Sequence, residues 1–173
     1  MVVAILMLKP VIAVDTNVLL DLANDDENVL DCFSTVHKKF PDCSIFVLPT
    51  VIDELNNHVK GGAKESALAL KALKNLLKWG FKPISVVPVG NGIVEETARK
   101  IRGAGLIPDE EINDSYIIAE AALANVNILL SSDDHLKNIN QAKLKEILDG
   151  CDLAGTIIFS PWKIVKDFYN SVH

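Results

Sequence analysis

Cysteine and histidine are scarce in this chain of 173 residues, which contains three cysteines and four histidines. Cys32, Cys43 and Cys151 are far apart in the sequence, and no Cys-x-x-Cys pair occurs. A structural zinc site and a disulfide framework are therefore both disfavoured. Unpaired thiols are typical of proteins kept in a reducing compartment, so we expect a cytoplasmic location.

Long apolar runs and an excess of positive charge are also lacking. The apolar stretch Met1–Leu8 is too short to span a bilayer, and no basic segment precedes it as in a signal peptide. We therefore expect no membrane association. The formal net charge of -6 disfavours a protein that coats nucleic acid by bulk attraction. It leaves room for a nuclease whose carboxylates are neutralised by cations.

Short apolar runs alternate with amphipathic segments along the chain. Strands separated by helices are typical of an α/β fold with a mostly parallel sheet, and right-handed crossovers place helices on both faces. We therefore predict a three-layer α/β/α fold with a five-stranded, mostly parallel sheet, formed by residues 1–173 as a single domain. The predicted strands cover residues 11–14, 44–48, 84–87, 127–131 and 156–159.

Acidic residues stand where two of the predicted strands end. Asp15 directly follows the first strand, and Asp133 follows the apolar run 128–130 after two serines. Sites in parallel sheets lie at the carboxyl ends of the strands, and a buried carboxylate is costly unless a cation or hydrogen bonds meet it. Asp134 competes with Asp133, and we expect one of the two to face inward and the other to cap the next helix.

Two further acids lie on predicted helices. Asp114 heads an apolar stripe that continues through Ile117 and Ala121, so its carboxylate should point toward the core. The helix dipole stabilises such a charge by only about 0.3–1 kcal/mol, less than its burial costs. A hydrogen bond to a loop, or a capping role, is the alternative. Glu54, in a helix that we expect to be capped by Thr50, is by itself typical of a solvated residue.

The four acids all follow a strand or begin the helix after it, so they should meet at one edge of the sheet. Carboxylates gathered in this way raise one another's pKa unless a cation is present. Oxygen ligands without cysteine or clustered histidine favour Mg²⁺ or Mn²⁺, and such a centre can activate water and polarise a phosphoryl oxygen. The residues therefore predict metal-assisted hydrolysis of a phosphate ester at Asp15, Glu54, Asp114 and Asp133.

Four segments of the chain resemble, in order, the motifs of the PIN domain family. They are Val14–Leu20, Pro49–Leu55, the Asn113-Asp114 pair ahead of Ile117, and Leu129–Leu136. The resemblance covers nearly the whole chain, residues 11–168. It implies that the first and fourth of five parallel strands are neighbours, which would place Asp15 beside Asp133.

PIN-domain proteins are mostly Mg²⁺- or Mn²⁺-dependent ribonucleases, so the resemblance implies an endoribonuclease that hydrolyses RNA phosphodiesters with metal-activated water. Asn17 and Ser131 would support the acids. The implied partners are an RNA substrate, an antitoxin protein as in the VapC-like toxin ribonucleases, and a second copy of the chain as a homodimer. The acids implied as catalytic residues and metal ligands are Asp15, Glu54, Asp114 and Asp133.

The segment 60–108 is long compared with many toxin members, which leaves a role in RNA processing or turnover open. Arg99, Lys100 and Arg102 precede the loop that leads to Asp114, and they are the predicted RNA contacts. Glu110 and Glu111 lie within a helical turn of Asp114. Either could join the acids, although we expect first-turn acids to face solvent. The two tryptophans, Trp79 and Trp162, are expected in packing or a dimer contact, not in base stacking.

Two other functions fit parts of this pattern. A phosphatase of the haloacid dehalogenase kind uses a strand-end Asp as its nucleophile, but it needs a second Asp two residues later, where this chain has Asn17. A PIN fold could also bind RNA or a protein without cleaving it. The intact set of four acids argues against such a non-catalytic module.

Overall fold

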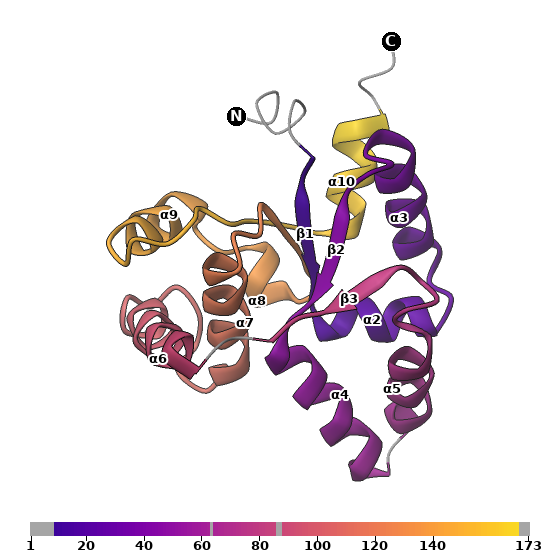
Figure 1. Ribbon diagram of the computed structural model, residues 1–173, viewed down its shortest axis with the longest axis horizontal. Helices are drawn as coiled ribbons and strands as arrows, with labels where there is room; N and C mark the ends of the chain where they lie inside the picture. The colour runs from indigo at the N-terminus through magenta and orange to yellow at the C-terminus, as the bar shows by residue number, and fades with distance from the viewer. Residues whose placement is uncertain (1–8, 63, 86–87, 170–173) are drawn as a thin grey trace.

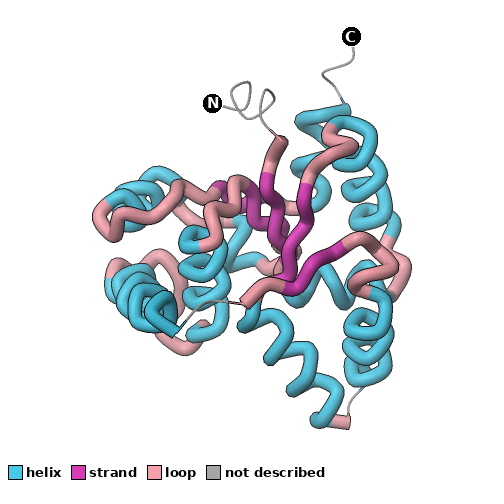
Figure 2. Tube along the Cα trace, viewed as in Figure 1, coloured by secondary structure: helices cyan, strands magenta, loops and turns pink. Residues whose placement is uncertain are grey.

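Five short strands form the centre of the protein, and helices cover both faces of the sheet (Figures 1 and 2). The computed structural model describes residues 9–62, 64–85 and 88–169; the apolar N-terminal stretch 1–8 lies outside this part of the chain. In chain order the elements are β1 (Val11–Val14), α2 (Thr16–Ala23), α3 (Glu27–Lys39), β2 (Ser44–Val47), α4 (Pro49–Gly61), α5 (Lys64–Asn75), β3 (Phe81–Pro83), α6 (Pro88–Gly103), α7 (Ile112–Leu123), β4 (Ile128–Leu130), α8 (Asp134–Lys137), α9 (Gln141–Asp149), β5 (Ile157–Phe159) and α10 (Pro161–Tyr169).

The sheet is parallel throughout, with the strand order β3-β2-β1-β4-β5. The central strand β1 has β4 as its neighbour, and Val14 is in register with Leu130. The residues that follow these two strands therefore leave the sheet side by side at its carboxyl edge. This topology confirms the predicted α/β fold and the predicted adjacency of the first and fourth strands.

The core is built on the apolar runs that predicted the strands. Ile12, Ala13 and Val14 are almost completely buried, as are Leu129 and Leu130 in the neighbouring strand. Such strands, covered on both faces, are apolar at every position rather than at alternate ones. In Figure 1, α2, α3, α5 and α10 lie on one side of the sheet, and α6, α7 and α9 lie on the other.

Local capping explains where helices begin. Asp26 caps α3 by accepting a hydrogen bond from the Val29 amide at 3.1 Å, and Glu27 in the first turn and Lys38 near the end complement the helix dipole. Among the described residues, no helix combines the length and the apolar character that crossing a membrane would require.

The third strand differs from its prediction. It covers Phe81–Pro83 instead of 84–87, and Val86 and Val87 of the predicted strand lie outside the described residues. The prediction treated Pro83 as a boundary. However, β3 is an edge strand of the sheet, and an edge strand tolerates proline because one side of its backbone needs no partner.

Candidate active site

Asp15 links the central strand to the helix that follows. It is the N-cap of α2, and its two oxygens accept hydrogen bonds from the Thr16 amide at 2.6 Å and the Ser131 hydroxyl at 2.7 Å. The residue is only 2% exposed. Burial raises the pKa of Asp15 to about 7; the hydrogen bonds from Ser131 and Thr16 lower it, and the charges of Glu54 and Asp133 raise it.

Ser131 joins Asp15 to the acid at the end of β4. Its buried hydroxyl donates to Asp15 and also accepts a hydrogen bond from the Asp133 amide at 3.0 Å. This is the supporting position that the resemblance assigned to it. A hydroxyl held between two strand ends fixes the orientation of the Asp15 carboxylate.

Asp133 caps the short helix α8, because its carboxylate accepts hydrogen bonds from the His135 amide at 2.7 Å and the Leu136 amide at 3.3 Å. Its charge also raises the pKa of Asp15 and of Asp114. Asp134 is exposed and forms an ion pair with Lys137 at 2.5 Å. The expectation that capping and facing the site would be divided between Asp133 and Asp134 is therefore wrong, since Asp133 does both.

Asp114 lies in the first turn of α7, whose N-cap position is occupied by Glu111. The Oδ2 atom of Asp114 is buried and has no hydrogen-bond partner among the described residues. Burial is the largest cause that raises the pKa of Asp114 to about 8, and the charges of Asp15, Asp133, Glu111 and Glu54 raise it further. A buried oxygen surrounded by negative charge is costly, so this side chain has the environment of a ligand that lacks its cation.

Glu54 reaches the same group of acids from α4. Its Oε2 accepts a hydrogen bond from the Thr16 hydroxyl, and its Oε1 accepts one from the Asn113 side chain at 2.8 Å. Both donors were missed as site residues by the sequence reasoning, although each is adjacent to a predicted acid. The two hydrogen bonds hold the Glu54 carboxylate between α2 and α7.

A second contact between α4 and α7 was also missed. Glu120 is 6% exposed, and its carboxylate accepts hydrogen bonds from the Thr50 amide at 3.1 Å and the Thr50 hydroxyl at 2.8 Å. Burial is the largest cause that raises the pKa of Glu120. Thr50 is therefore not the N-cap of α4. The N-cap is Leu48, two residues earlier, which makes no side-chain capping bond, and the helix begins at Pro49.

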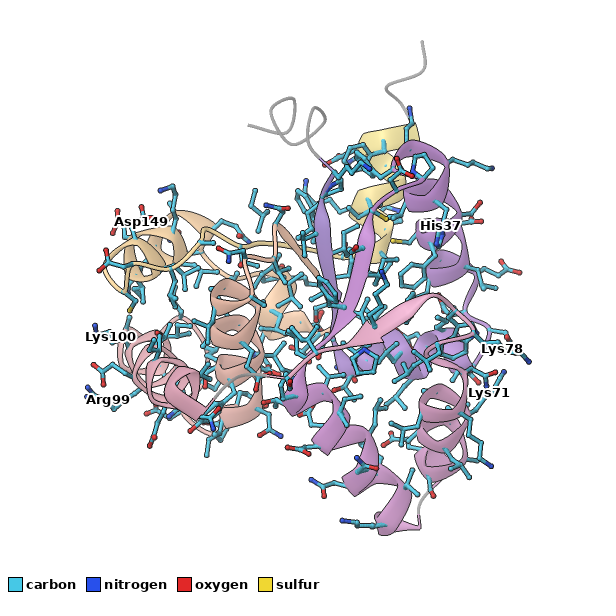
Figure 3. All side chains as sticks on the ribbon, in the orientation of Figure 1. His37, Lys71, Lys78, Arg99, Lys100 and Asp149 are labelled. Carbon is cyan, nitrogen blue, oxygen red and sulfur yellow. The ribbon has the colours of Figure 1, made fainter. Side chains whose placement is uncertain are left out.

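The remaining predicted site residues are Asn17 and the three predicted RNA contacts, and their surroundings differ. Asn17 is exposed, and Thr16 supplies the hydroxyl that reaches Glu54. Figure 3 shows Arg99 and Lys100 on the side of α6 that faces away from the sheet, where both pair with Glu96, at 2.6 and 3.8 Å. Arg102 donates to the Ser115 hydroxyl, one residue from Asp114.

Glu111, unlike Glu110, adds to the acidic group, because its charge raises the pKa of Asp114. Its carboxylate lies 4.0 Å from the His135 ring, which brings α8 close to the start of α7. Glu110 is exposed, as we expected for a first-turn acid. The acidic group thus extends from the strand ends to the loop before α7.

The acids affect one another's pKa values, but among the described residues their carboxylates are not spaced closely enough to coordinate one metal ion. Within the described ranges, no three His, Cys, Asp or Glu side chains are close enough to form a metal-ligating group. The chemistry of the residues nevertheless fits a hard divalent ion, because the acids offer only oxygen and because Asp114 Oδ2 is buried with no hydrogen-bond partner among residues 9–62, 64–85 and 88–169. The two raised pKa values have the same main cause, desolvation by burial, and the neighbouring negative charges raise both further.

Comparison with known proteins identifies the class. The PIN domain family matches residues 12–142, about three quarters of the chain, so the chain belongs to the PIN domain family. Members of this family are generally nucleases that use divalent metal ions. No curated protein matches the sequence.

Two solved structures show the same fold. VapBC2 from Rickettsia felis, bound to a DNA fragment from their promoter, is similar with a TM-score of 0.61 and 17% identity, covering 87% of this chain and 98% of that chain. FitAB bound to the IR36 DNA fragment is similar with a TM-score of 0.52 and 17% identity, covering 87% and 95%. Identity at this level supports a shared fold only.

Proposed function

We propose that this protein is an endoribonuclease that depends on Mg²⁺ or Mn²⁺. The observation that carries the proposal is the buried Oδ2 of Asp114, which has no hydrogen-bond partner in the described part of the chain and belongs to a carboxyl group whose pKa the charges of Asp15, Glu54 and Asp133 raise, in a chain of the PIN family. Three of the acids follow β1 or β4 or begin α7, and Glu54 comes from α4. This is the carboxyl edge at which sites of parallel sheets form.

In this proposal Asp15, Asp114 and Asp133 hold the ion. When bound, the ion would polarise the scissile phosphate and lower the pKa of water, so that hydrolysis leaves a 5′ phosphate and a 3′ hydroxyl. Because the carboxylates do not already form a ligating group, binding requires their side chains to adjust. For this purpose Asp114 has an oxygen to which no described residue donates a hydrogen bond.

The neighbouring residues orient these acids and the water. Ser131 and the Thr16 amide fix the Asp15 carboxylate. Glu54 is held at both oxygens, a geometry suited to orienting a water molecule for attack, by contact with that water or through the ion. No side chain is required as a covalent nucleophile.

The cellular setting that we propose is the cytoplasm, because Cys32, Cys43 and Cys151 are all free thiols. A protein partner of the antitoxin kind is supported by the fold shared with VapBC2 and FitAB, and a homodimer rests on the family resemblance alone. The predicted RNA contact supported best by its location is Arg102, since it bonds to the residue next to Asp114.

A cleavage assay on single-stranded RNA tests the proposal with two adjacent residues as a matched pair. Asp133→Asn removes a proposed ligand but keeps a good helix cap, whereas Asp134→Asn removes only an exposed ion pair. We expect cleavage with Mn²⁺ for the parent chain and Asp134→Asn, and loss of cleavage for Asp133→Asn and in the presence of EDTA.

The other outcomes assign the chain to a different class. Cleavage that persists in EDTA would contradict the metal-dependent nuclease. Binding of RNA without cleavage under every divalent ion would indicate the non-catalytic module. Release of phosphate from small esters, with RNA left intact, would indicate a phosphatase.

A further inference from the structure

A cavity of about 520 Å³ lies at the same carboxyl edge of the sheet as the acids. It forms where the ends of β4 and β5 approach the starts of α3 and α10, beside α8. Its lining combines an aromatic ring with residues of both charge signs. Those that matter here are Asp21, Asp26, Ser132, Lys137, Trp162 and Lys163.

Trp162 supplies the aromatic ring, and it is 59% exposed. This exposure argues against the first of its two expected roles, packing, and leaves the second, a dimer contact, as a prediction. It lies in the first turn of α10, which Ser160 caps by accepting a hydrogen bond from the Lys163 amide at 3.2 Å. The Nζ atom of Lys166 lies 4.8 Å from the centroid of the Trp162 ring, and this cation–π contact helps to fix the ring at the cavity.

The elements that line the cavity also carry the acids of the candidate active site. Ser132 is the residue before Asp133, and the Lys137 amide donates to the Asp133 carbonyl at 3.0 Å. Asp21 lies on α2, the helix that Asp15 caps. A strand of nucleic acid whose phosphate lies at Asp133 would therefore have the cavity next to it.

The residues that line the cavity carry both negative and positive charges, and this determines which chemical groups can bind there. Lys137 and Lys163 are neutralised in part by ion pairs with Asp134 at 2.5 Å and Asp167 at 3.1 Å, and Asp21 and Asp26 add negative charge. A bare phosphate is disfavoured in such surroundings. An uncharged, planar group with N–H donors fits better, because it can stack on tryptophan and donate to carboxylates.

We infer that this cavity holds an unpaired nucleobase of the RNA, stacked on Trp162, from a nucleotide next to the scissile phosphate. The inference rests on the proposed ribonuclease activity and adds a residue that contacts the substrate. A base can leave its stack and enter a cavity from a single strand, whereas a duplex keeps its bases stacked and paired. Trp162 is therefore a substrate-binding residue outside the acidic group.

Steady-state kinetics with Mn²⁺ test the role of the ring. Stacking of one base on an aromatic side chain contributes about 1–3 kcal/mol, so Trp162→Ala should raise KM about 10- to 100-fold. The kcat should change little, because the contact is made in the ground state and the transition state alike. Trp162→Phe should restore most of the loss. The matched control is Leu77→Ala, which removes another large exposed side chain (78% exposed) on a different surface.

Fluorescence tests contact directly. Trp162 is the sole tryptophan in a Trp79→Phe variant, which keeps an aromatic ring beside Phe81. Titration with a single-stranded RNA oligonucleotide at low salt in EDTA should quench its fluorescence, and the same sequence as a duplex should not. Quenching without any cleavage in Mn²⁺ would support the base site while overturning the proposed nuclease.

Two results would overturn the base site. An unchanged KM for Trp162→Ala, in a protein that cleaves RNA normally, would contradict it and leave the proposed nuclease intact. A concentration-dependent mass that falls to that of the monomer in Trp162→Ala, with KM unchanged, would make the cavity a contact between copies of the chain instead.

Discussion

Asp15 and Asp114 belong to the same group of acids, but the hydrogen bonding of their carboxylates differs. Asp15 has both oxygens hydrogen-bonded, by the Thr16 amide and the Ser131 hydroxyl. Asp114 has a buried oxygen with no partner among the described residues. The pKa of each is raised, to about 7 and about 8, chiefly by burial. Only for Asp15 do hydrogen bonds from the protein offset part of that effect.

This difference separates a carboxylate that the fold orients from one that the fold leaves unsatisfied. An oriented acid keeps its geometry with or without an ion. An unsatisfied one gains most when a cation arrives, since its desolvation is otherwise uncompensated. We therefore expect ion binding to stabilise the Asp114 carboxylate more than the Asp15 carboxylate. We expect Asp15 to determine the geometry in which the ion is held.

The largest effect is expected for Asp114→Asn. Loss of a charge that holds the ion should cost several kcal/mol of transition-state stabilisation, which lowers kcat/KM by about 10³-fold or more. The same variant should unfold at a higher temperature than the parent chain in EDTA at pH 8, because it no longer buries an unpaired charge. Cleavage rates and thermal melts check both parts. A variant within about tenfold of the parent's activity would show that Asp114 holds no ion.

Removing the hydroxyl that orients Asp15 should have a smaller effect. Ser131→Ala leaves every acid in place but deletes the 2.7 Å hydrogen bond, and loss of such a supporting contact costs about 10- to 100-fold in activity or metal affinity. The pKa of Asp15 should rise further, so the acid limb of the pH–rate profile should move to higher pH. Ser131→Thr keeps the hydroxyl and is the control. An unchanged profile in Ser131→Ala would refute the orienting role.

The free energy of unfolding of the metal-free protein should decrease as the pH rises, which is the opposite of what acids with lowered pKa values produce. Above about pH 4 the unfolded chain has released the protons of these two acids, while the folded chain retains them until the pH approaches about 7 for Asp15 and about 8 for Asp114. The folded state therefore binds more protons, and stability falls as pH rises.

We expect urea unfolding in EDTA to give a free energy of unfolding that is lower at pH 8 than at pH 5 by several kcal/mol, because both acids contribute to the difference. Added Mn²⁺ at pH 8 should reverse the loss. The decrease in the free energy of unfolding between pH 5 and pH 8 should be smaller in the Asp114→Asn variant, which lacks one of the two titrating acids. Stability that increases steadily from pH 5 to pH 8 in EDTA would not be compatible with the raised pKa values.

The smallest effect that we predict concerns the hydrogen-bonded contact between α4 and α7, the helices that carry Glu54 and Asp114. Glu120→Gln replaces one carboxylate oxygen by a donor that faces the Thr50 hydroxyl or amide, and the loss of one buried hydrogen bond costs about 1 kcal/mol. The Tm should fall by about 2–4 °C. The Thr50→Val variant removes the hydroxyl from the other side. If the Glu120→Gln and Thr50→Val losses are additive in the double variant, the two residues do not act as a pair.

The acids that follow strands were the easiest part of the site to predict from the sequence. An apolar run followed by an Asp identifies both a strand and its carboxyl end, which located Asp15 and Asp133. Asp114 was found because it breaks an apolar helical stripe. The adjacency of the first and fourth strands followed from the family resemblance, and the mostly parallel sheet followed from the alternation of strands and helices.

The contacts that the sequence did not reveal are those made across long distances in the chain. Glu120 lies 70 residues from Thr50, and nothing local distinguishes it from a surface glutamate. Thr16 and Asn113 gain their role from where Glu54 is held, which depends on the packing of α4 against α7. Whether Asp133 or Asp134 caps α8 depends on one backbone turn. Exposure of Trp162 depends on the surroundings of α10, which its amphipathic pattern does not specify.

Titration of Mn²⁺ into the metal-free protein by calorimetry at pH 8 tests the central claim most directly. We predict binding accompanied by proton release, since Asp114 is partly protonated at that pH with a pKa of about 8, and loss of binding in Asp114→Asn. Asp134→Asn should titrate like the parent chain. No binding by the parent chain, or equal binding by the Asp114→Asn variant, would contradict the account.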